Sequence, residues 1–123
     1  MKYLCMVIVD EKKLNAMSSS ERRKLDDESL AYDETLRKSG HLLAAQALQG
    51  IETATTIRAS GGRISVTDGP FTETNEQIGG FVLLEARDLD EAIQLASKIP
   101  AMCLGCIEVR PIMELTPGPE TAG

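Results

Sequence analysis

The sequence predicts an α+β fold in which a strand–helix–strand unit occurs twice, with a β-hairpin between the two units. Three observations predict this fold. Two segments have helical caps and helical periodicity, six apolar or β-branched runs surround them, and a Gly-Gly dipeptide separates two of those runs. A chain of 123 residues corresponds to one domain, which we expect over residues 1–115, followed by a flexible tail over 116–123.

The first unit begins with a strand over residues 2–9, whose apolar composition favours burial on both faces. A helix follows over residues 19–39, because Ser18 stands three residues before a glutamate, the spacing of a capping box. Gly40 suits the left-handed conformation that ends many helices. Residues 41–48 complete the unit as a second strand, although alanines lower its β propensity.

The hairpin and the second unit follow in the same way. Residues 54–59 and 63–68 are rich in β-branched side chains and flank a Gly-Gly turn, which is typical of a hairpin. An apolar strand is expected over 79–86. A helix over 89–99 has an aspartate as its N-cap and ends at a proline, and 105–114 form the last strand.

This order of elements is the ferredoxin-like plan, βαβ-hairpin-βαβ. Two helices cover only one face of such a sheet, yet the first strand is apolar on both faces. One face carries Tyr3, Cys5, Val7 and Val9, and the other carries Leu4, Met6 and Ile8. An uncovered apolar sheet face would expose a larger apolar area than monomeric proteins usually do. We therefore expect a homodimer in which two copies pack sheet to sheet.

The composition excludes several classes of partner. A net charge of −6 and a pI near 4.8 repel phosphate backbones, so nucleic acid is not expected as a partner. No apolar stretch approaches the roughly 18 residues of a membrane span, and the opening run is too short for a signal peptide. The three cysteines therefore indicate reduced thiols, and we expect a cytoplasmic protein.

Cys103 and Cys106 form a single C-x-x-C pair, which raises the question of a redox or zinc site. The pair follows a helix and leads into a strand, unlike a thioredoxin-type pair. A zinc site would need Cys5 and His41 as further ligands, and Cys5 approaches Cys106 if the first and last strands are neighbours. Small buried thiols are the commoner case, so we expect neither a metal nor a cofactor.

The stretch DGPFTETNEQIGGF is the strongest candidate for a ligand-facing loop. Asp68 ends a strand, and the following Gly-Pro dipeptide forces a turn. Phe71 is an apolar ring in a polar loop, so we expect it to be buried and to fix the loop. A fixed loop would present Asp68, Glu73 and Gln77 to a polar ligand. The alternative is a solvent-exposed loop that only connects two strands and is polar for that reason.

Two further positions carry groups that suit a binding site. His41 is the only histidine and stands where a strand begins, either as a general base or as a structural hydrogen-bonding residue. Glu108 and Arg110 alternate with apolar residues on the last strand, so they share one face. They form either an ion pair or a ligand clamp.

Three segments resemble one known family. TDGPFTETNEQIGGFVLLEARDLDEAIQLASKIP is similar to the DGPF-domain group of YCII-related proteins, as are the opening MKYLCMVIVDE and the closing GCIEVRPIMEL. The resemblance spans residues 1–115. It implies a ferredoxin-like α+β fold paired into a dimeric α+β barrel.

The resemblance also implies a kind of site. YCII-like relatives are regarded as enzymes with a His–Asp pair, whose histidine lies near the position of Tyr32 and Asp33 in this chain. No histidine stands there, so the pair does not carry over intact. Asp68 is the acid that matches, and His41 is the histidine that would replace the missing one. Relatives in this group also occur beside, or fused to, sigma factors of the extracytoplasmic type.

Two functions follow as hypotheses. In the first, each subunit binds an unknown small molecule in a cleft, with Asp68 as acid or base, His41 as its partner, and Glu73, Gln77 and Arg110 as positioning groups. In the second, the protein is a non-catalytic regulatory module that binds a sigma factor through the acids of its first long helix. The sequence favours the first.

Overall fold

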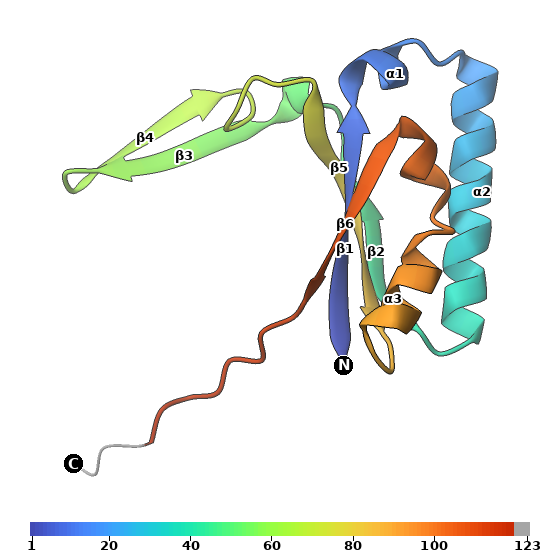
Figure 1. Ribbon diagram of the computed structural model, residues 1–123. Helices are drawn as coiled ribbons and strands as arrows, with labels where there is room; N and C mark the ends of the chain where they lie inside the picture. Colours follow the sequence, from blue (N-terminus) through green and yellow to red (C-terminus); the bar gives the residue numbers. More distant parts are fainter. Residues whose placement is uncertain (120–123) are drawn as a thin grey trace.

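The computed structural model describes residues 1–119 and shows a four-stranded antiparallel sheet with helices on one face only (Figure 1). Its strands are β1 (Lys2–Asp10), β2 (Leu42–Ala47), β3 (Thr55–Ser60), β4 (Arg63–Asp68), β5 (Glu76–Glu85) and β6 (Gly105–Pro111). Its helices are α1 (Glu11–Asn15), α2 (Ser19–Lys38), the 3-10 turn η1 (Ile51–Thr53), α3 (Leu89–Ala96) and the 3-10 turn η2 (Pro100–Leu104). Of the expected tail 116–123, residues 120–123 lie outside the described residues.

The strand order in the main sheet is β2-β5-β1-β6, and β5 pairs antiparallel with both β1 and β2. Each pair of parallel strands, β1 with β2 and β5 with β6, is therefore separated by one intervening strand and joined through a helix. This is the split βαβ arrangement, used twice. The predicted ferredoxin-like α+β fold is confirmed.

The helix ends are set by the residues that the sequence indicates. The Ser18 hydroxyl accepts a hydrogen bond from the Glu21 N–H, and the Glu21 carboxylate accepts one from the Ser18 N–H, so the capping box is complete. At the other end of α2, Gly40 has a φ of 80°, where a side chain would be strained. The Asp88 carboxylate caps α3 through the Glu91 N–H.

The core lies between the sheet and the helices. Alternate residues of β1 point toward α2 and α3 and are buried, and their neighbours on β5 are Val82 and Leu84. Leu36 is the fully buried anchor of α2, and Leu25 and Tyr32 pack beside it as partly buried residues. Burial of each such aliphatic side chain contributes about 1.5–3 kcal/mol. The aliphatic core fixes the distance between α2 and the sheet.

The other face of the sheet carries an apolar surface that we call the open face. It consists of Leu4, Met6, Ile8, Phe81 and Leu83, which the strand register places side by side. These side chains are only partly buried, and Figure 1 shows that the helices lie on the opposite side. The expectation that the helices leave one apolar face uncovered is confirmed for the single chain.

The hairpin of β3 and β4 forms a second, two-stranded sheet that projects away from the body of the molecule (Figure 1). Its turn contains Gly61 and Gly62, both with positive φ, as the predicted Gly-Gly turn requires. The projection extends on the side of the open face, away from α2. We call this hairpin the arm.

Two elements differ from the sequence-based expectation. The segment after β1, expected as a connector, forms the short helix α1, which Asp10 caps through the Lys12 N–H. β5 begins at Glu76 instead of residue 79, because an irregular pairing near Gly79 lets the strand continue along β1. The glycines hide this continuation, since they interrupt the apolar pattern. Within residues 1–119, no helix combines the length and apolar character needed to cross a membrane.

Candidate functional site

A groove of about 760 Å³ lies between α2 and the side of the sheet formed by β2 and the chain leading into η1. Its volume falls in the range of small-molecule sites in proteins. The sheet contributes apolar residues to its floor, and η2 closes one side. These lining residues include Val7, Val9, Ala45, Val82, Ile99 and Leu104.

The wall formed by α2 carries polar side chains beside the apolar Leu25 and Leu30. Arg22, Asp26, Ser29 and Asp33 all line the groove. Their spacing of four, three and four residues places them in one row along the helix. An apolar floor with a few polar groups along one wall is the usual composition of a ligand site.

Asp33 is the group in this row whose ionisation the protein alters. Burial raises the pKa of its carboxyl above the usual range, and the Arg37 guanidinium partly opposes that shift. Its side chain is half-buried and has no hydrogen-bond partner among residues 1–119. A carboxyl in this setting is suited to accept a hydrogen bond from a ligand or to exchange a proton with it.

The neighbouring Tyr32 is held in a structural role. Its hydroxyl donates a 2.6 Å hydrogen bond to the Leu95 carbonyl oxygen, which ties α2 to the end of α3. Burial raises the pKa of this phenol, and the nearby Cys5 thiol adds to the shift. Tyr32 therefore fixes the helix that carries Asp33.

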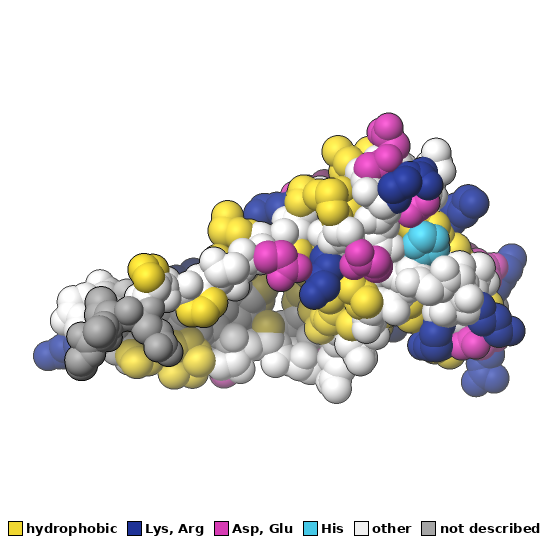
Figure 2. All heavy atoms as spheres, turned by 90° about the horizontal axis from the view of Figure 1, so that it is seen from below, with side chains coloured by type: hydrophobic (Ala, Val, Ile, Leu, Met, Phe, Trp, Pro, Cys, Tyr) yellow, Lys and Arg dark blue, Asp and Glu magenta, His cyan; other side chains and the backbone are white. Residues whose placement is uncertain are grey.

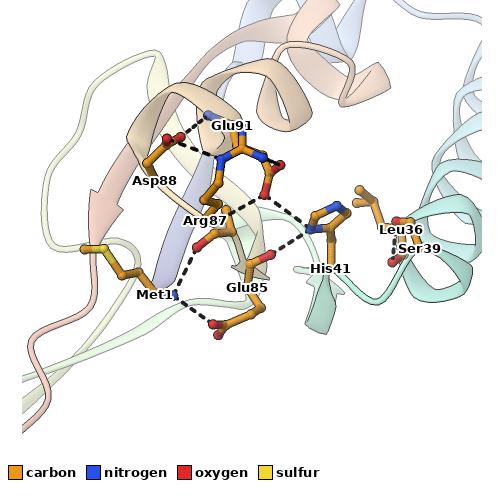
Figure 3. A network of polar contacts seen from close by, with 9 residues as sticks. Met1, Leu36, Ser39, His41, Glu85, Arg87, Asp88 and Glu91 are labelled. Atoms are coloured by element: carbon orange, nitrogen blue, oxygen red, sulfur yellow. Dashed lines mark hydrogen bonds and ion pairs between the residues drawn. The ribbon is translucent and has the colours of Figure 1, made fainter.

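His41 lies in a separate hollow of about 270 Å³ at the opposite end of β2 (Figure 3). Its Nδ1 atom is 2.8 Å from the Glu85 carbonyl oxygen and 4.0 Å from the Glu91 Oε1 atom. Glu91 is itself held by the Arg87 guanidinium at 3.2 Å and by the Arg87 N–H at 2.9 Å. The Met1 ammonium completes the network through Glu85 and the Ala86 carbonyl oxygen.

This network favours a structural role for His41. When Nδ1 donates to the Glu85 carbonyl oxygen, the neutral ring keeps Nε2 as an acceptor. The ring thus joins the start of β2 to the end of β5, where the Glu85 N–H also donates to the His41 carbonyl oxygen. The sequence-based alternative of a histidine that hydrogen-bonds at a strand start describes what the structure shows.

Asp68 lies far from His41 along the sheet. His41 precedes β2 and pairs with the C-terminal end of β5, whereas Asp68 ends β4 and pairs with Thr55, beyond the other end of β2. Asp68 is exposed at the base of the arm and does not line the groove. The expectation of a single cleft that contains Asp68 and His41 of one chain is therefore wrong, because the full length of β2 separates the two residues.

The loop between β4 and β5 is fixed by a residue other than the one expected. Phe71 is 70% exposed, so the expectation that it is buried and holds the loop is wrong for the single chain. Gln77 is only 6% exposed, and its Nε2 atom donates to the carbonyl oxygens of Thr72 and Thr74 at 2.8 and 2.9 Å. Arg58 of the arm donates to the Phe71 carbonyl oxygen at 2.9 Å.

The remaining predicted residues lie apart from both hollows. Glu73 is exposed in the same loop. Arg110 donates a 2.7 Å hydrogen bond to Glu108, and both belong to the edge strand β6 on the side of the open face. The two side chains are largely exposed, so this pair contributes little to stability.

The cysteines do not converge. Cys5 pairs with Val109 on the face covered by helices, whereas Cys106 pairs with Ile8 on the open face. The expected approach of Cys5 to Cys106 is therefore wrong, because the two side chains point to opposite sides of the sheet. Within residues 1–119 no three metal-binding side chains come together, whether cysteine, histidine or carboxylate.

Sequence reasoning missed the polar row on α2. In the sequence, Arg22, Asp26, Ser29 and Asp33 resemble an ordinary solvated helix face, and the acids of this helix suit a basic protein partner equally well. The signal that separates them is position, since the row lies directly beside the apolar stripe of Leu25, Tyr32 and Leu36. Ser29 and Asp33 of this row are half-buried at the edge of the core, whereas Arg22 and Asp26 are exposed at the mouth of the groove.

Comparison with known proteins agrees with this fold. The family model described as YCII-related domain matches residues 1–116. The chain is 33% identical over 120 residues to an uncharacterized protein of Rhizobium meliloti (strain 1021), with 96% of this chain and 97% of that protein covered.

A solved structure is similar in fold. It is the 5-chloro-2-hydroxyhydroquinone dehydrochlorinase of Burkholderia phenoliruptrix in complex with 2,5-dihydroxybenzoquinone, with a TM-score of 0.53, 19% identity, and coverage of 92% of this chain and 94% of that chain. At this identity the likeness shows the fold alone. The family match over nearly the whole chain shows that this protein belongs to the YCII-related domain family.

Proposed function

We propose that the protein binds a small molecule in the groove between α2 and the sheet, with Asp33 as its principal polar contact. The observation that carries the proposal is a half-buried carboxyl of raised pKa, without a hydrogen-bond partner in the described chain, on the wall of an apolar groove of about 760 Å³. The Asp33 oxygen atoms keep contact with solvent, so a ligand that donates a hydrogen bond would replace water at this partly desolvated carboxyl.

The groove suggests the chemistry of its ligand. The apolar floor suits a ring or a short aliphatic chain, Asp33 suits a hydroxyl or amine donor, and Arg22 suits an acidic substituent. The similar solved structure holds a small dihydroxylated ring, which supports the choice of hydroxylated rings as the first probes. If a reaction occurs, Asp33 is the group placed to exchange a proton.

The residues predicted from the DGPF loop remain a competing proposal for the binding site. The loop residues Asp68, Phe71 and Glu73 are exposed around the base of the arm. The Asp-Gly-Pro-Phe motif, which begins at Asp68, is the reason to place the chain in the DGPF group. Among them, Asp68 is the acid whose loss should matter most if the loop is the site. The groove takes precedence because it is concave and buries part of its lining.

We further propose that two copies form a homodimer through the open face. Five apolar side chains lie there without a covering helix, and burial against a second copy removes them from water. Sheet-to-sheet packing with two-fold symmetry also explains why this side of the molecule is apolar while α2 is charged. A dimeric α+β barrel is the resulting assembly, and its cytoplasmic location stays a prediction.

A sigma factor remains the alternative partner, and we place it second. The acids of α2 do not form an unbalanced patch, since Glu28 lies 3.9 Å from Lys24 and Glu34 pairs with Arg37. Asp33, another of those acids, lies in the groove wall. A helix that carries its own counter-ions is a weak binding surface for a basic partner.

Thermal unfolding with a panel of hydroxylated aromatic acids, quinones and aliphatic hydroxy acids tests the proposal. Present at a hundred times its dissociation constant, a ligand stabilises the folded chain by about 2.7 kcal/mol, which raises the midpoint by several degrees. We expect a shift in the wild type that Asp33→Asn loses and Asp68→Asn keeps. The asparagine retains the size of the side chain, so both variants should fold.

The opposite pattern would transfer the site to the DGPF loop. A shift that Asp68→Asn loses and Asp33→Asn keeps contradicts the groove. The absence of a shift with every compound also counts against small-molecule binding, and it directs the search to a protein partner.

A further inference from the structure

The arm is an amphipathic hairpin. Ile57 pairs with Val66 and Ala59 pairs with Ile64, so the three large apolar side chains share one face. The pairs between them, including Arg58 with Ser65, place polar side chains on the other face. Strict alternation of this kind is typical of a strand pair that is buried on one side.

That apolar face is uncovered in the single chain. Ile57 is 68% exposed, Ile64 is 73% exposed and Val66 is 65% exposed. A two-stranded hairpin on its own is marginally stable in water. Three exposed branched side chains on one face also make such a hairpin prone to association with other chains. The single chain therefore leaves the apolar face of the arm without a packing partner among the described residues.

The arm, the open face and the segment after β6 lie on the same side of the molecule, whereas exposed Leu30 of α2 and exposed Leu89 and Ile93 of α3 lie on the helical side. The arm projects on the side of the open face, and the segment after β6, with exposed Met113 and Leu115, extends there as well (Figure 1). In Figure 2, which shows the molecule from below relative to Figure 1, hydrophobic side chains occur along the projecting part and on the adjoining side of the body. The chain thus carries both an apolar projection and an apolar surface of its own to receive one.

Charge also favours a second copy as the partner. The arm, residues 55–68, holds Arg58, Arg63 and one acid, Asp68, and so carries +1, whereas the whole chain carries −6 and the rest of the chain therefore carries −7. A basic arm is complementary to the acidic body of another copy. A second copy of the chain is always present at the same concentration, so it can cover the apolar face of every arm.

We propose that the arm is an intersubunit clasp: its apolar face, formed by Ile57, Ile64 and Val66, packs against a second copy of the chain. This inference rests on the proposed homodimer through the open face and adds a second, separate contact to it. In the dimer the arm is covered, and its strands become resistant to local opening.

Two neighbouring residues of β4 provide matched variants. Val66→Asp places a charge on the apolar face of the arm, and Ser65→Asp places the same charge on the polar face one residue away. We expect Val66→Asp to weaken the dimer at least tenfold in sedimentation equilibrium, and Ser65→Asp to leave it within about twofold of the wild type. Equal dimer affinity for the two variants overturns the clasp. Both variants leave the main sheet intact, because the arm is a sheet of its own.

Limited digestion with trypsin separates the clasp from the dimer itself. Arg58 lies in the middle of β3, and a trypsin cut after it requires the arm to be accessible. The clasp predicts slow cleavage after Arg58 in the wild-type dimer and fast cleavage in Val66→Asp. A wild type that is dimeric but cleaved as fast as the variant overturns the clasp and leaves the open-face dimer standing. A wild type that is monomeric at all concentrations overturns both.

Discussion

Replacement of Gln77 should release the loop between β4 and β5. This side chain is buried, and its amide nitrogen donates hydrogen bonds to the Thr72 and Thr74 carbonyl oxygens at 2.8 and 2.9 Å. Both hydrogens of one amide are thus used to close the turn that leads from the arm into β5. In Gln77→Leu, the apolar side chain keeps a similar size and donates nothing.

The magnitude follows from the two bonds. An intramolecular hydrogen bond contributes about 0.5–1.5 kcal/mol net, so the loss of both lowers the free energy of unfolding by about 1–3 kcal/mol. Urea unfolding of the wild type and the variant measures this difference. Glu73→Gln is the matched control, since this exposed residue of the same loop should change the free energy of unfolding by less than about 0.5 kcal/mol.

Gln77→Glu gives the same reasoning a pH dependence. The introduced carboxylate faces two carbonyl oxygens, so at pH 7 we expect a loss of about 3 kcal/mol or more. The folded state raises the pKa of this carboxyl above its unfolded value of about 4.3. Stability is therefore greatest relative to the wild type below pH 4 and declines as pH rises through the folded pKa. If Gln77→Leu unfolds at the wild-type urea concentration, or the Gln77→Glu deficit does not depend on pH, the assigned role of Gln77 is refuted.

Three further outcomes are expected. Ser18→Ala removes the capping box of α2 and should lower the free energy of unfolding by about 1 kcal/mol in urea; an unchanged midpoint contradicts the assignment. Gly80→Ala places a Cβ atom 2.7 Å from the Gln46 carbonyl oxygen, so thermal unfolding should show a clear loss, whereas wild-type stability would mean that β2 moves freely. Burial raises the pKa of the Cys5 thiol from 9.0 to about 11. The protonated thiol therefore stabilises the folded state fully below pH 9, and the free energy of unfolding falls by about 2–3 kcal/mol as the pH rises to 11. Cys5→Ala should flatten that decline, and an equally steep decline in the variant would count against it.

Much of the fold could be predicted from local signals. The capping box at Ser18, the glycine at 40 and the Gly-Gly turn each act within a few residues, so their physics is legible in a short stretch of sequence. The strand order then follows from the few ways in which two βαβ units can share one sheet. The uncovered apolar face could also be predicted, because β1 is apolar at every position from Tyr3 to Val9.

The candidate site could not be predicted in the same way. The separation of His41 from Asp68 depends on which end of β2 each approaches, and no short-range pattern carries that information. The sequence places Phe71 in the interior because aromatic rings are usually buried, but its loop follows the arm, which is a two-stranded sheet without a core of its own. Asp33 gains its character from the distance between α2 and the sheet, which only the packed core sets.

Chemical-shift mapping of the backbone amides, with the strongest ligand from the unfolding screen, tests the central claim most directly. The groove predicts the largest changes on both of its walls, at residues 29–33 of α2 and at residues 45–51 from β2 into η1. The changes in both segments should disappear together in Asp33→Asn. Largest changes in the loop over residues 69–75, or around His41, would contradict the account and place the ligand elsewhere.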